Sequence, residues 1–311
     1  MHGRVVKNTG SFYDVRPDNE GARIPCKVKG NFRLRGIRST NPVAVGDFVT
    51  FQKAENEEVG FITEIDERRN YIIRKASNLS KQSHILAANV DLALLLVTVA
   101  RPETATTFID RFLASAEAYR IPVALIINKC DDLRNDKEKG VAENWKLIYE
   151  PIGYPVVMAQ LIENETVGLD EIRKLIESKT VLLAGNSGVG KSTLLNALIP
   201  EAHVKTAEVS EMHGTGQHTT TFSQLIEGQG FELIDIPGIK GFGTFDITPE
   251  ELSHYFRDIF RVAENCRFDN CTHTHEPGCA VRIALENGEI APSRFNSYLS
   301  MLEDQDEAKY R

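Results

Sequence analysis

Apolar runs and amphipathic segments alternate through the middle of the chain. Five short apolar runs lie at residues 90–97, 123–127, 156–159, 181–184 and 231–234. The first two are continuous rather than alternating, which is typical of strands buried on both faces of a sheet. Residues 106–120 and 169–176 instead repeat their apolar positions at helical spacing. The pattern predicts a multidomain α/β chain whose central domain is a mainly parallel sheet covered by helices.

The two flanks of this region have different patterns. Residues 1 to about 72 contain short segments rich in valine, isoleucine and phenylalanine, broken by glycines and without a useful helical period. They predict a small five-stranded β-barrel of the oligonucleotide-binding (OB) type. Residues 246–311 contain two helical stretches, 249–263 and 292–304, and too little apolar sequence for a core that is stable without help. We expect domains at residues 1–72, 73–245 and 246–311.

The charge of the chain is acidic overall but unevenly distributed. Its 311 residues carry a formal net charge of −8, which argues against a uniformly basic nucleic-acid binder. Residues 1–75 nevertheless hold 14 lysines and arginines against 10 acidic residues. A basic stretch without any acidic residue is formed by Arg23, Lys27, Lys29, Arg33, Arg35 and Arg38. On one face of a barrel this stretch would meet nucleic-acid phosphates, and the alternative is a solvated basic surface.

No membrane partner is expected. The first seven residues do not form a signal-peptide pattern, and the longest apolar run, near residues 90–100, is too short to cross a bilayer. We therefore expect a cytoplasmic protein. No feature of the sequence demands a dimer, so a monomer is expected.

A phosphate-binding motif follows the apolar run at residues 181–184. It reads Gly185-Asn186-Ser187-Gly188-Val189-Gly190-Lys191-Ser192. Its glycines let backbone N–H groups turn toward a phosphate chain, and the next helix directs its N-terminus there. Lys191 would reach the β- and γ-phosphates, and Ser192 would ligate Mg²⁺.

A guanine-binding motif, Asn128-Lys129-Cys130-Asp131, follows the apolar run at residues 123–127. The Asp131 carboxylate can accept hydrogen bonds from N1–H and the exocyclic amine of guanine, which adenine does not offer in that position. Asn128 would tie the neighbouring loops together, and the stem of Lys129 would cover one face of the base. The motif precedes the phosphate-binding motif, the reverse of the order in ordinary GTP-binding domains. The same site therefore requires a cyclically rearranged chain.

Two further segments complete the predicted site. Asp235 and Gly238 belong to an Asp-Ile-Pro-Gly motif, in which the carboxylate would hold Mg²⁺ through water and the Gly238 N–H would sense the γ-phosphate. The polar loop at residues 214–221 can bring a threonine to Mg²⁺. We choose Thr220, while Thr219 and Thr221 stay open and an ordinary β-threonine run is the alternative.

The residue that orients the attacking water is not evident. Ile239 occupies the position after Gly238, where many GTPases carry a glutamine, so we expect slow intrinsic hydrolysis. His213, His218 and Asp246 are the only nearby candidates, and each is explained as readily by a structural role.

A cysteine cluster near the C-terminus predicts a metal site. Cys266, Cys271, His273 and Cys279 lie within fourteen residues and are the ligand types of a closed structural zinc site. His275 and Glu276 are nearby alternatives, with a supporting hydrogen bond or simple exposure as the other readings of His275. Cys26 and Cys130 are interpreted as ordinary buried or half-buried thiols.

Together these motifs resemble the circularly permuted, ribosome-small-subunit-dependent GTPase family RsgA, also called YjeQ. The resemblance covers nearly the whole chain. It implies an OB-fold domain, a permuted GTPase domain and a zinc domain that act on the small ribosomal subunit and its rRNA late in maturation. It also implies a phosphoanhydride hydrolase that converts GTP to GDP and is stimulated by that subunit.

The resemblance transfers roles to positions that match the family motifs. It assigns guanine binding to Asn128, Lys129 and Asp131, the phosphate loop to Gly185 through Thr193, and zinc to the cysteine cluster. The chain departs from the family in two places. Met158-Ala159-Gln160 stands where a Ser-Ala pair precedes a base-contacting turn, so only the Ala159 backbone can serve, and Asp246 stands where some members have a histidine.

Two functions from different classes follow. The first is an enzyme whose GTP cycle switches its affinity for the small subunit. The second is an RNA-binding module in which the barrel and zinc domain do the work and GTP mainly stabilises the fold. The intact Lys191, Ser192 and Asp235 favour the enzyme.

Overall fold

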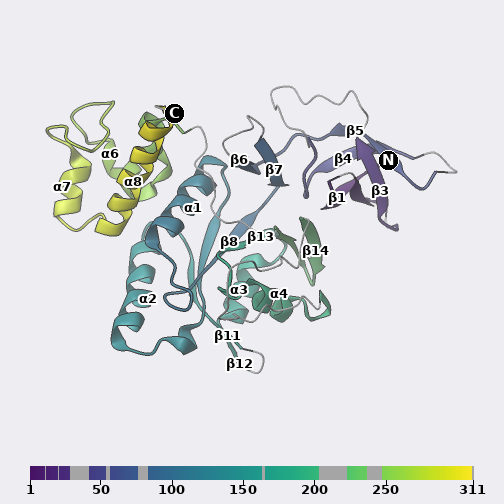
Figure 1. Cartoon of the computed structure of the whole chain (residues 1–311), viewed down its shortest axis with the longest axis horizontal. Coiled ribbons are helices and arrows are strands. Elements are labelled where there is room, and N and C mark those ends of the chain that lie inside the picture. The colour runs from purple at the N-terminus through teal and green to yellow at the C-terminus, as the bar shows by residue number, and fades with distance from the viewer. Residues whose placement is uncertain are drawn as a thin grey trace.

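The structure is a computed structural model in which three parts are arranged in a row. It describes residues 1–10, 12–19, 21–28, 42–53, 57–75, 83–162, 165–202, 223–236 and 247–309. Figure 1 shows a β-barrel, in purple, at one end and the helices α7 and α8, in yellow, at the other. The sheet and helices of the central part lie between them.

The N-terminal part is a closed five-stranded barrel. Its strands are β1 (His2–Asn8), β2 (Tyr13–Pro17), β3 (Ile24–Val28), β4 (Phe48–Gln52) and β5 (Gly60–Ile65). They pair in the order β1-β2-β3-β5-β4, and β4 pairs back with β1. Alternate residues fill the interior, among them Val5, Val15, Val49 and Phe51, which are fully buried. The predicted barrel is confirmed.

The basic stretch of the barrel is only partly described. Arg23 and Lys27 lie within the described residues, whereas Lys29, Arg33, Arg35 and Arg38 lie outside them. Whether the six residues share one face of the barrel therefore stays a prediction.

The central part is built on a mainly parallel sheet, as its continuous apolar runs predict. Its strands are β8 (Leu92–Val97), β9 (Val123–Ile127), β10 (Val156–Met158), β13 (Thr180–Gly185), β14 (Gln224–Gly228) and β15 (Phe231–Asp235). The order is β10-β9-β8-β13-β15-β14, and every pair is parallel except the antiparallel pair β14 and β15. Two small hairpins flank the sheet: β6 (Tyr71–Lys75) with β7 (Ser83–Ala88), and β11 (Gln160–Ile162) with β12 (Glu165–Val167).

Helices cover both faces of this sheet. The helices are α1 (Thr106–Ala118), α2 (Asp136–Tyr149), α3 (Leu169–Ile176) and α4 (Lys191–Leu198). Side chains of β8 alternate between two cores, so that Leu95 packs with α1 and α2 while Leu94 packs with α3 and α4. Alternate side chains of β8 therefore face α1 and α2 on one side of the sheet and α3 and α4 on the other.

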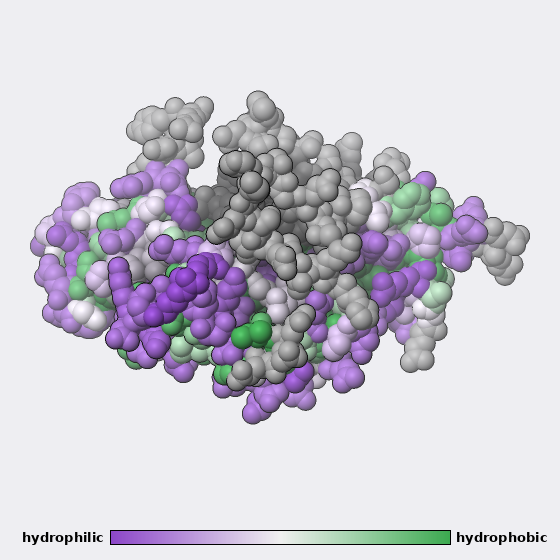
Figure 2. Space-filling model, turned by 60° about the horizontal axis from the view of Figure 1, so that its bottom comes forward, coloured by the Kyte–Doolittle hydropathy of each residue, from purple (hydrophilic) through white to green (hydrophobic). Residues whose placement is uncertain are grey.

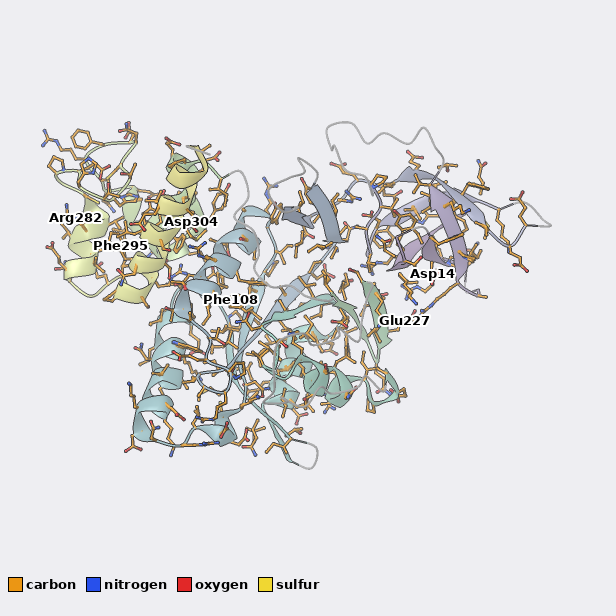
Figure 3. The ribbon with its side chains drawn as sticks, viewed as in Figure 1. Asp14, Phe108, Glu227, Arg282, Phe295 and Asp304 are labelled. Atoms are coloured by element: carbon orange, nitrogen blue, oxygen red, sulfur yellow. The ribbon has the colours of Figure 1, made fainter. Side chains whose placement is uncertain are left out.

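The barrel continues into the central sheet. Lys7 of β1 pairs with Gln224 of β14, so the barrel strands and the central strands form one eleven-stranded sheet. Arg4 and Arg16 of the barrel both form ion pairs with Glu232 of β15. Figure 3 labels Asp14 on β2 and Glu227 on β14, on the two sides of this junction. The expected boundary after residue 72 falls inside β6, and the boundary at 245 lies outside the described residues.

The C-terminal part is helical, but one predicted helix is interrupted. Its elements are α5 (Pro249–Leu252), a 3-10 turn (Ser253–Tyr255), α6 (Arg257–Ala263), α7 (Ala280–Glu286) and α8 (Pro292–Lys309). The stretch 249–263 is not a single helix because Phe256 is extended, with φ −111° and ψ 96°. Its ring is fully buried and packs edge-on against Tyr298, with ring centroids 5.5 Å apart. Tertiary packing therefore overrides the helical pattern.

A buried ion-pair network holds this part on α1. Arg294 of α8 bonds Asp110 of α1 at 2.8 Å and Asp258 of α6 at 2.7 Å. The Tyr149 hydroxyl donates to the same Asp110 oxygen at 2.8 Å. Ala114 of α1 belongs to the hydrophobic core of the C-terminal part. Figure 3 shows α8, labelled at Phe295 and Asp304, beside α1.

The outer surface is mixed in character. In Figure 2, hydrophobic residues are scattered among hydrophilic ones wherever the atoms are coloured. Among the helices of the described residues, none has the length and apolar character needed to cross a membrane.

Candidate nucleotide site and metal cluster

The parallel strands bring three sequence motifs to one edge of the central sheet. Asn128 follows β9, the glycine-rich loop follows β13, and Asp235 ends β15. β9 and β13 lie on either side of β8, and β15 lies next to β13. The carboxyl ends of the three strands are therefore close together. Ligands of open α/β sheets bind at such an edge.

The loop between β13 and α4 depends on two glycines. Gly185 and Gly190 have φ angles of 141° and 101°, which L side chains rarely adopt. A Cβ on Gly185 would lie 2.3 Å from the Leu96 carbonyl oxygen, and one on Gly190 would lie 2.3 Å from Asn128 Nδ2. α4 begins at Lys191, directly after the loop. The free N–H groups of its first turn therefore point toward the loop.

Two opposite charges, Lys191 and Asp235, lie at the phosphate-binding side of this edge. Lys191 Nζ donates to the carbonyl oxygens of Gly185 at 2.9 Å and Asn186 at 2.6 Å. Burial lowers the pKa of Lys191, and the Asp235 carboxylate opposes that shift. Burial likewise raises the pKa of Asp235, opposed by Lys191. The two opposite charges thus support each other in a partly desolvated place.

The loop after β9 is tied to the glycine-rich loop. The buried Asn128 side chain donates from Nδ2 to the Val189 carbonyl oxygen at 2.9 Å. Lys129 Nζ donates to the Arg101 carbonyl oxygen at 2.8 Å. Asp131 lies in the 3-10 turn Cys130–Asp132 and its side chain is exposed. The arrangement offers an outward carboxylate beside a loop that is fixed to the phosphate-binding segment.

The other predicted site residues differ in their exposure to solvent. Val189 is buried, Ser187 is exposed, and Asn186, Gly188, Ser192 and Thr193 are half-buried. The Ala159 N–H donates to the Ile127 carbonyl oxygen at 2.8 Å, so a bond from this amide to a base would require that contact to be exchanged. The remaining candidates lie outside the described residues: His213, His218, Thr219, Thr220, Thr221, Gly238, Ile239 and Asp246.

The four predicted metal ligands converge. One ligand atom from each of Cys266, Cys271, His273 and Cys279 lies within 4.8 Å of the others. His273 Nδ1 is 3.6 Å from Cys266 Sγ and 3.5 Å from Cys279 Sγ. Zinc bond lengths at a tetrahedral angle require an N···S separation of about 3.5 Å. The residues present therefore fit a structural zinc ion.

The protonation of the cluster also suits a metal. Burial lowers the pKa of His273, which keeps the imidazole in its neutral, coordinating form. Burial raises the pKa of Cys271 to about 12. Binding of a divalent cation would therefore release thiol protons from the cluster.

Glu276 lies outside the converging group of four, and its carboxylate holds the turn that carries His273. Its carboxylate accepts from the Thr272 N–H at 2.8 Å and the Thr272 hydroxyl at 2.6 Å. It also accepts from the N–H groups of Thr274 at 3.0 Å and His275 at 3.1 Å. His275 itself is exposed and outside the cluster. In the sequence, only the position of Glu276 beside the predicted ligands indicated that it could support the metal site.

Residues 65–245 match the model of the RsgA GTPase family, and residues 2–62 match that of the RsgA N-terminal domain. The chain belongs to the RsgA GTPase family. The two matches meet between residues 62 and 65, before the boundary expected from the sequence. The resemblance inferred from the motifs is thereby confirmed.

Relatives match over the full length of the chain. A protein of Phocaeicola vulgatus named "Small ribosomal subunit biogenesis GTPase RsgA" is 56% identical over 313 residues, covering 100% of this chain and 99% of the relative. A Bacteroides fragilis protein of the same name is 57% identical over 314 residues, with the same coverage.

Two solved structures have the same overall fold. YjeQ from Thermotoga maritima matches with a TM-score of 0.76 and 34% identity, covering 97% of each chain. YloQ, described as a circularly permuted GTPase, matches with a TM-score of 0.74 and 31% identity, covering 100% of this chain and 96% of its own. The permuted motif order is therefore a property of the fold that this chain shares.

Proposed function

We propose that this chain is a GTP hydrolase that binds the small ribosomal subunit and acts in its late maturation. The observation that carries the proposal is identity of 54–57% over the full length with relatives named for this process. The convergence of the glycine-rich loop, the Asn128 loop and Asp235 at one sheet edge supports the chemistry. A small-subunit partner also implies a cytoplasmic location, and we propose a monomer.

In this proposal each residue of the edge has a definite task. Asn186 through Thr193 bind the phosphates through backbone N–H groups, and Lys191 neutralises charge on the β- and γ-phosphates. Asp131 accepts from guanine N1–H and the exocyclic amine, while Lys129 covers the base. Ser192, Thr220 and Asp235 are the residues that would hold Mg²⁺, directly or through water. When bound there, the ion would neutralise negative charge on the phosphates during hydrolysis.

The metal cluster has a structural task. We propose that it holds one zinc ion, because the N···S separations match tetrahedral zinc and the ligands are three thiols and one imidazole. A metal cross-link would add to the stability that the hydrophobic core of the C-terminal part and its packing on α1 provide.

The GTP state is proposed to switch affinity for the subunit. Thr220 and Gly238 would be ordered by the γ-phosphate and released after hydrolysis. The barrel and the C-terminal part would contact rRNA from the two ends of the molecule. Because Ile239 replaces a glutamine, hydrolysis by the free protein should be slow.

The test is steady-state GTP turnover with and without purified small subunits, together with subunit binding in a GTP analogue and in GDP. We expect stimulated turnover and tighter binding in the analogue. Unstimulated turnover with equal binding in both states would favour the alternative, an RNA-binding module in which GTP is structural. Lys191→Ala should lower turnover about a hundredfold or more, and normal turnover by that variant would refute the site.

A further inference from the structure

Arg101 clamps the turn that carries Asp131. It lies in the loop between β8 and α1, and its Nε donates to Asp132 Oδ2 at 2.5 Å. Its Nη2 donates to the Asp132 backbone oxygen as well. The guanidinium also reaches both carboxylate oxygens of Glu138, at 3.0 and 3.3 Å. One side chain thus joins the loop after β8 to two neighbouring carboxylates that lie 31 and 37 residues further along the chain.

The backbone of the same residue holds the other side of the turn. Lys129 Nζ donates to the Arg101 carbonyl oxygen at 2.8 Å, and Lys129 itself is left-handed with φ 62°. Asp131 therefore lies between two residues, Lys129 and Asp132, that are both bonded to Arg101. Its own side chain is exposed, so its direction depends on the backbone of these neighbours.

The far end of the clamp is itself fixed. Glu138 accepts from the Arg134 N–H at 2.8 Å, and its own N–H is capped by Asn135 Oδ1 at 2.9 Å. The hydrogen bonds from Arg101, followed by those from the Arg134 backbone, lower the pKa of Glu138 to about 2. The carboxylate is thus ionised at every pH at which the protein is assayed, and it anchors Arg101 to the first turn of α2.

We propose that Arg101 is a positioning residue for guanine recognition, which aims the Asp131 carboxylate at the two hydrogen-bond donors of the base. This inference rests on the proposed guanine site. Discrimination by a carboxylate with two hydrogen bonds depends on its direction, because a rotated carboxylate keeps one bond and loses the other. In this role Arg101 acts through the turn, by its bonds to Asp132 and Lys129.

The experiment compares GDP with inosine diphosphate (IDP), whose base keeps N1–H but lacks the exocyclic amine. Affinities are measured by calorimetry on the zinc-loaded full-length chain. Arg101→Ala should lower the GDP to IDP affinity ratio about fivefold, the scale of partly exposed ion pairs. The affinities of this variant for GTP and for GDP should fall by the same factor, since the base is common to both nucleotides. Arg101→Lys, which keeps the charge but not the fork, should restore part of the ratio.

Arg134→Ala is the matched control. The Arg134 side chain is also bonded to the Asp132 carboxylate, at 3.1 Å, but within the described residues it is not bonded to Lys129 or to the Arg101 backbone. It should leave the GDP to IDP ratio unchanged. Thermal unfolding of both variants shows whether the fold is intact.

An unchanged ratio in Arg101→Ala, with or without a general loss of affinity, would overturn the proposal. Asp131→Ala separates this failure from failure of the guanine site. If Asp131→Ala collapses the ratio and Arg101→Ala does not, only the role of Arg101 is refuted. If neither variant changes the ratio, the guanine site itself is wrong.

Discussion

Replacing Arg294 with methionine tests how the C-terminal part is held on the GTPase core. The Arg294 side chain is 1% exposed, and its partners Asp110 and Asp258 are 0% and 3% exposed. Methionine keeps much of the apolar contact with the Phe256 ring, which lies 4.7 Å from the guanidinium carbon. The substitution therefore removes the charge while leaving two buried carboxylates without their partner.

The expected loss follows from that burial. Breaking a buried ion pair by removing one partner costs about 3–5 kcal/mol, because the remaining charge is not solvated. Tyr149→Phe removes one hydrogen bond to the Asp110 carboxylate and should cost about 1.5–3 kcal/mol. Arg111→Ala is the matched control on α1: its partners Ser300 and Asp304 lie on the same helix as Arg294, but the ion pair is partly exposed. Its loss should stay below about 1 kcal/mol.

Urea unfolding followed by tryptophan fluorescence measures these differences. Trp145 is the only tryptophan of the chain, is buried, and packs in the same core cluster as Tyr149. All variants are compared in the zinc-loaded form, so that metal loss does not contribute. If the free energy of unfolding falls no further in Arg294→Met than in Arg111→Ala, the network does not hold the C-terminal part and the reasoning is wrong.

Three further outcomes are expected. Gly190→Ala should weaken GDP binding at least about tenfold in calorimetry, because the added Cβ would meet the Asn128 side chain. Gly230→Ala, also at positive φ but in open space, should leave GDP binding unchanged. Glu276→Gln should weaken zinc retention about tenfold to a hundredfold against a chelator, because the turn around His273 keeps only one of its two acceptor oxygens and loses the negative charge. Hydrogen bonds to two aspartates raise the pKa of His2 above 6.5, so this stabilisation is present below pH 6.5 and lost as pH rises through the raised value. The urea concentration at the unfolding midpoint should fall as pH rises from 6.5 through the raised pKa of His2. His2→Asn should remove the part of this fall that is due to His2.

Strands of the central sheet could be predicted because burial on both faces leaves a continuous apolar run. β9 has the bounds that its apolar run gives, Val123–Ile127. The break in the helical stretch 249–263 could not be predicted in the same way. Phe256 leaves the helical conformation because its ring is buried between Tyr298 and Arg294, which lie about 40 residues further along the chain.

In the candidate site, too, local motifs could be predicted from the sequence, whereas contacts between distant residues could not. The glycine-rich loop and the Asn128 loop are local patterns with a local physical reason, so the sequence alone indicates them. The clamp by Arg101 has no local pattern, since it exists only where the loop after β8 meets a segment more than 30 residues further along the chain. Glu276 shows a related limit: an acidic residue beside metal ligands reads as a possible ligand, and only the hydrogen bonds of its carboxylate show that it holds the turn instead.

The docking of α8 on α1 gives the permuted motif order a mechanical consequence. α1 follows the Arg101 loop and so belongs to the base-binding half of the site, whereas the chain reaches the C-terminal part from Asp235, in the phosphate-binding half. The C-terminal part is thus connected covalently to one half and packed on the other through Arg294. Allosteric coupling is typically about 1–3 kcal/mol, which is less than the cost of breaking the buried network. We therefore expect the C-terminal part to keep its place on α1 through the nucleotide cycle and to move together with the base-binding half.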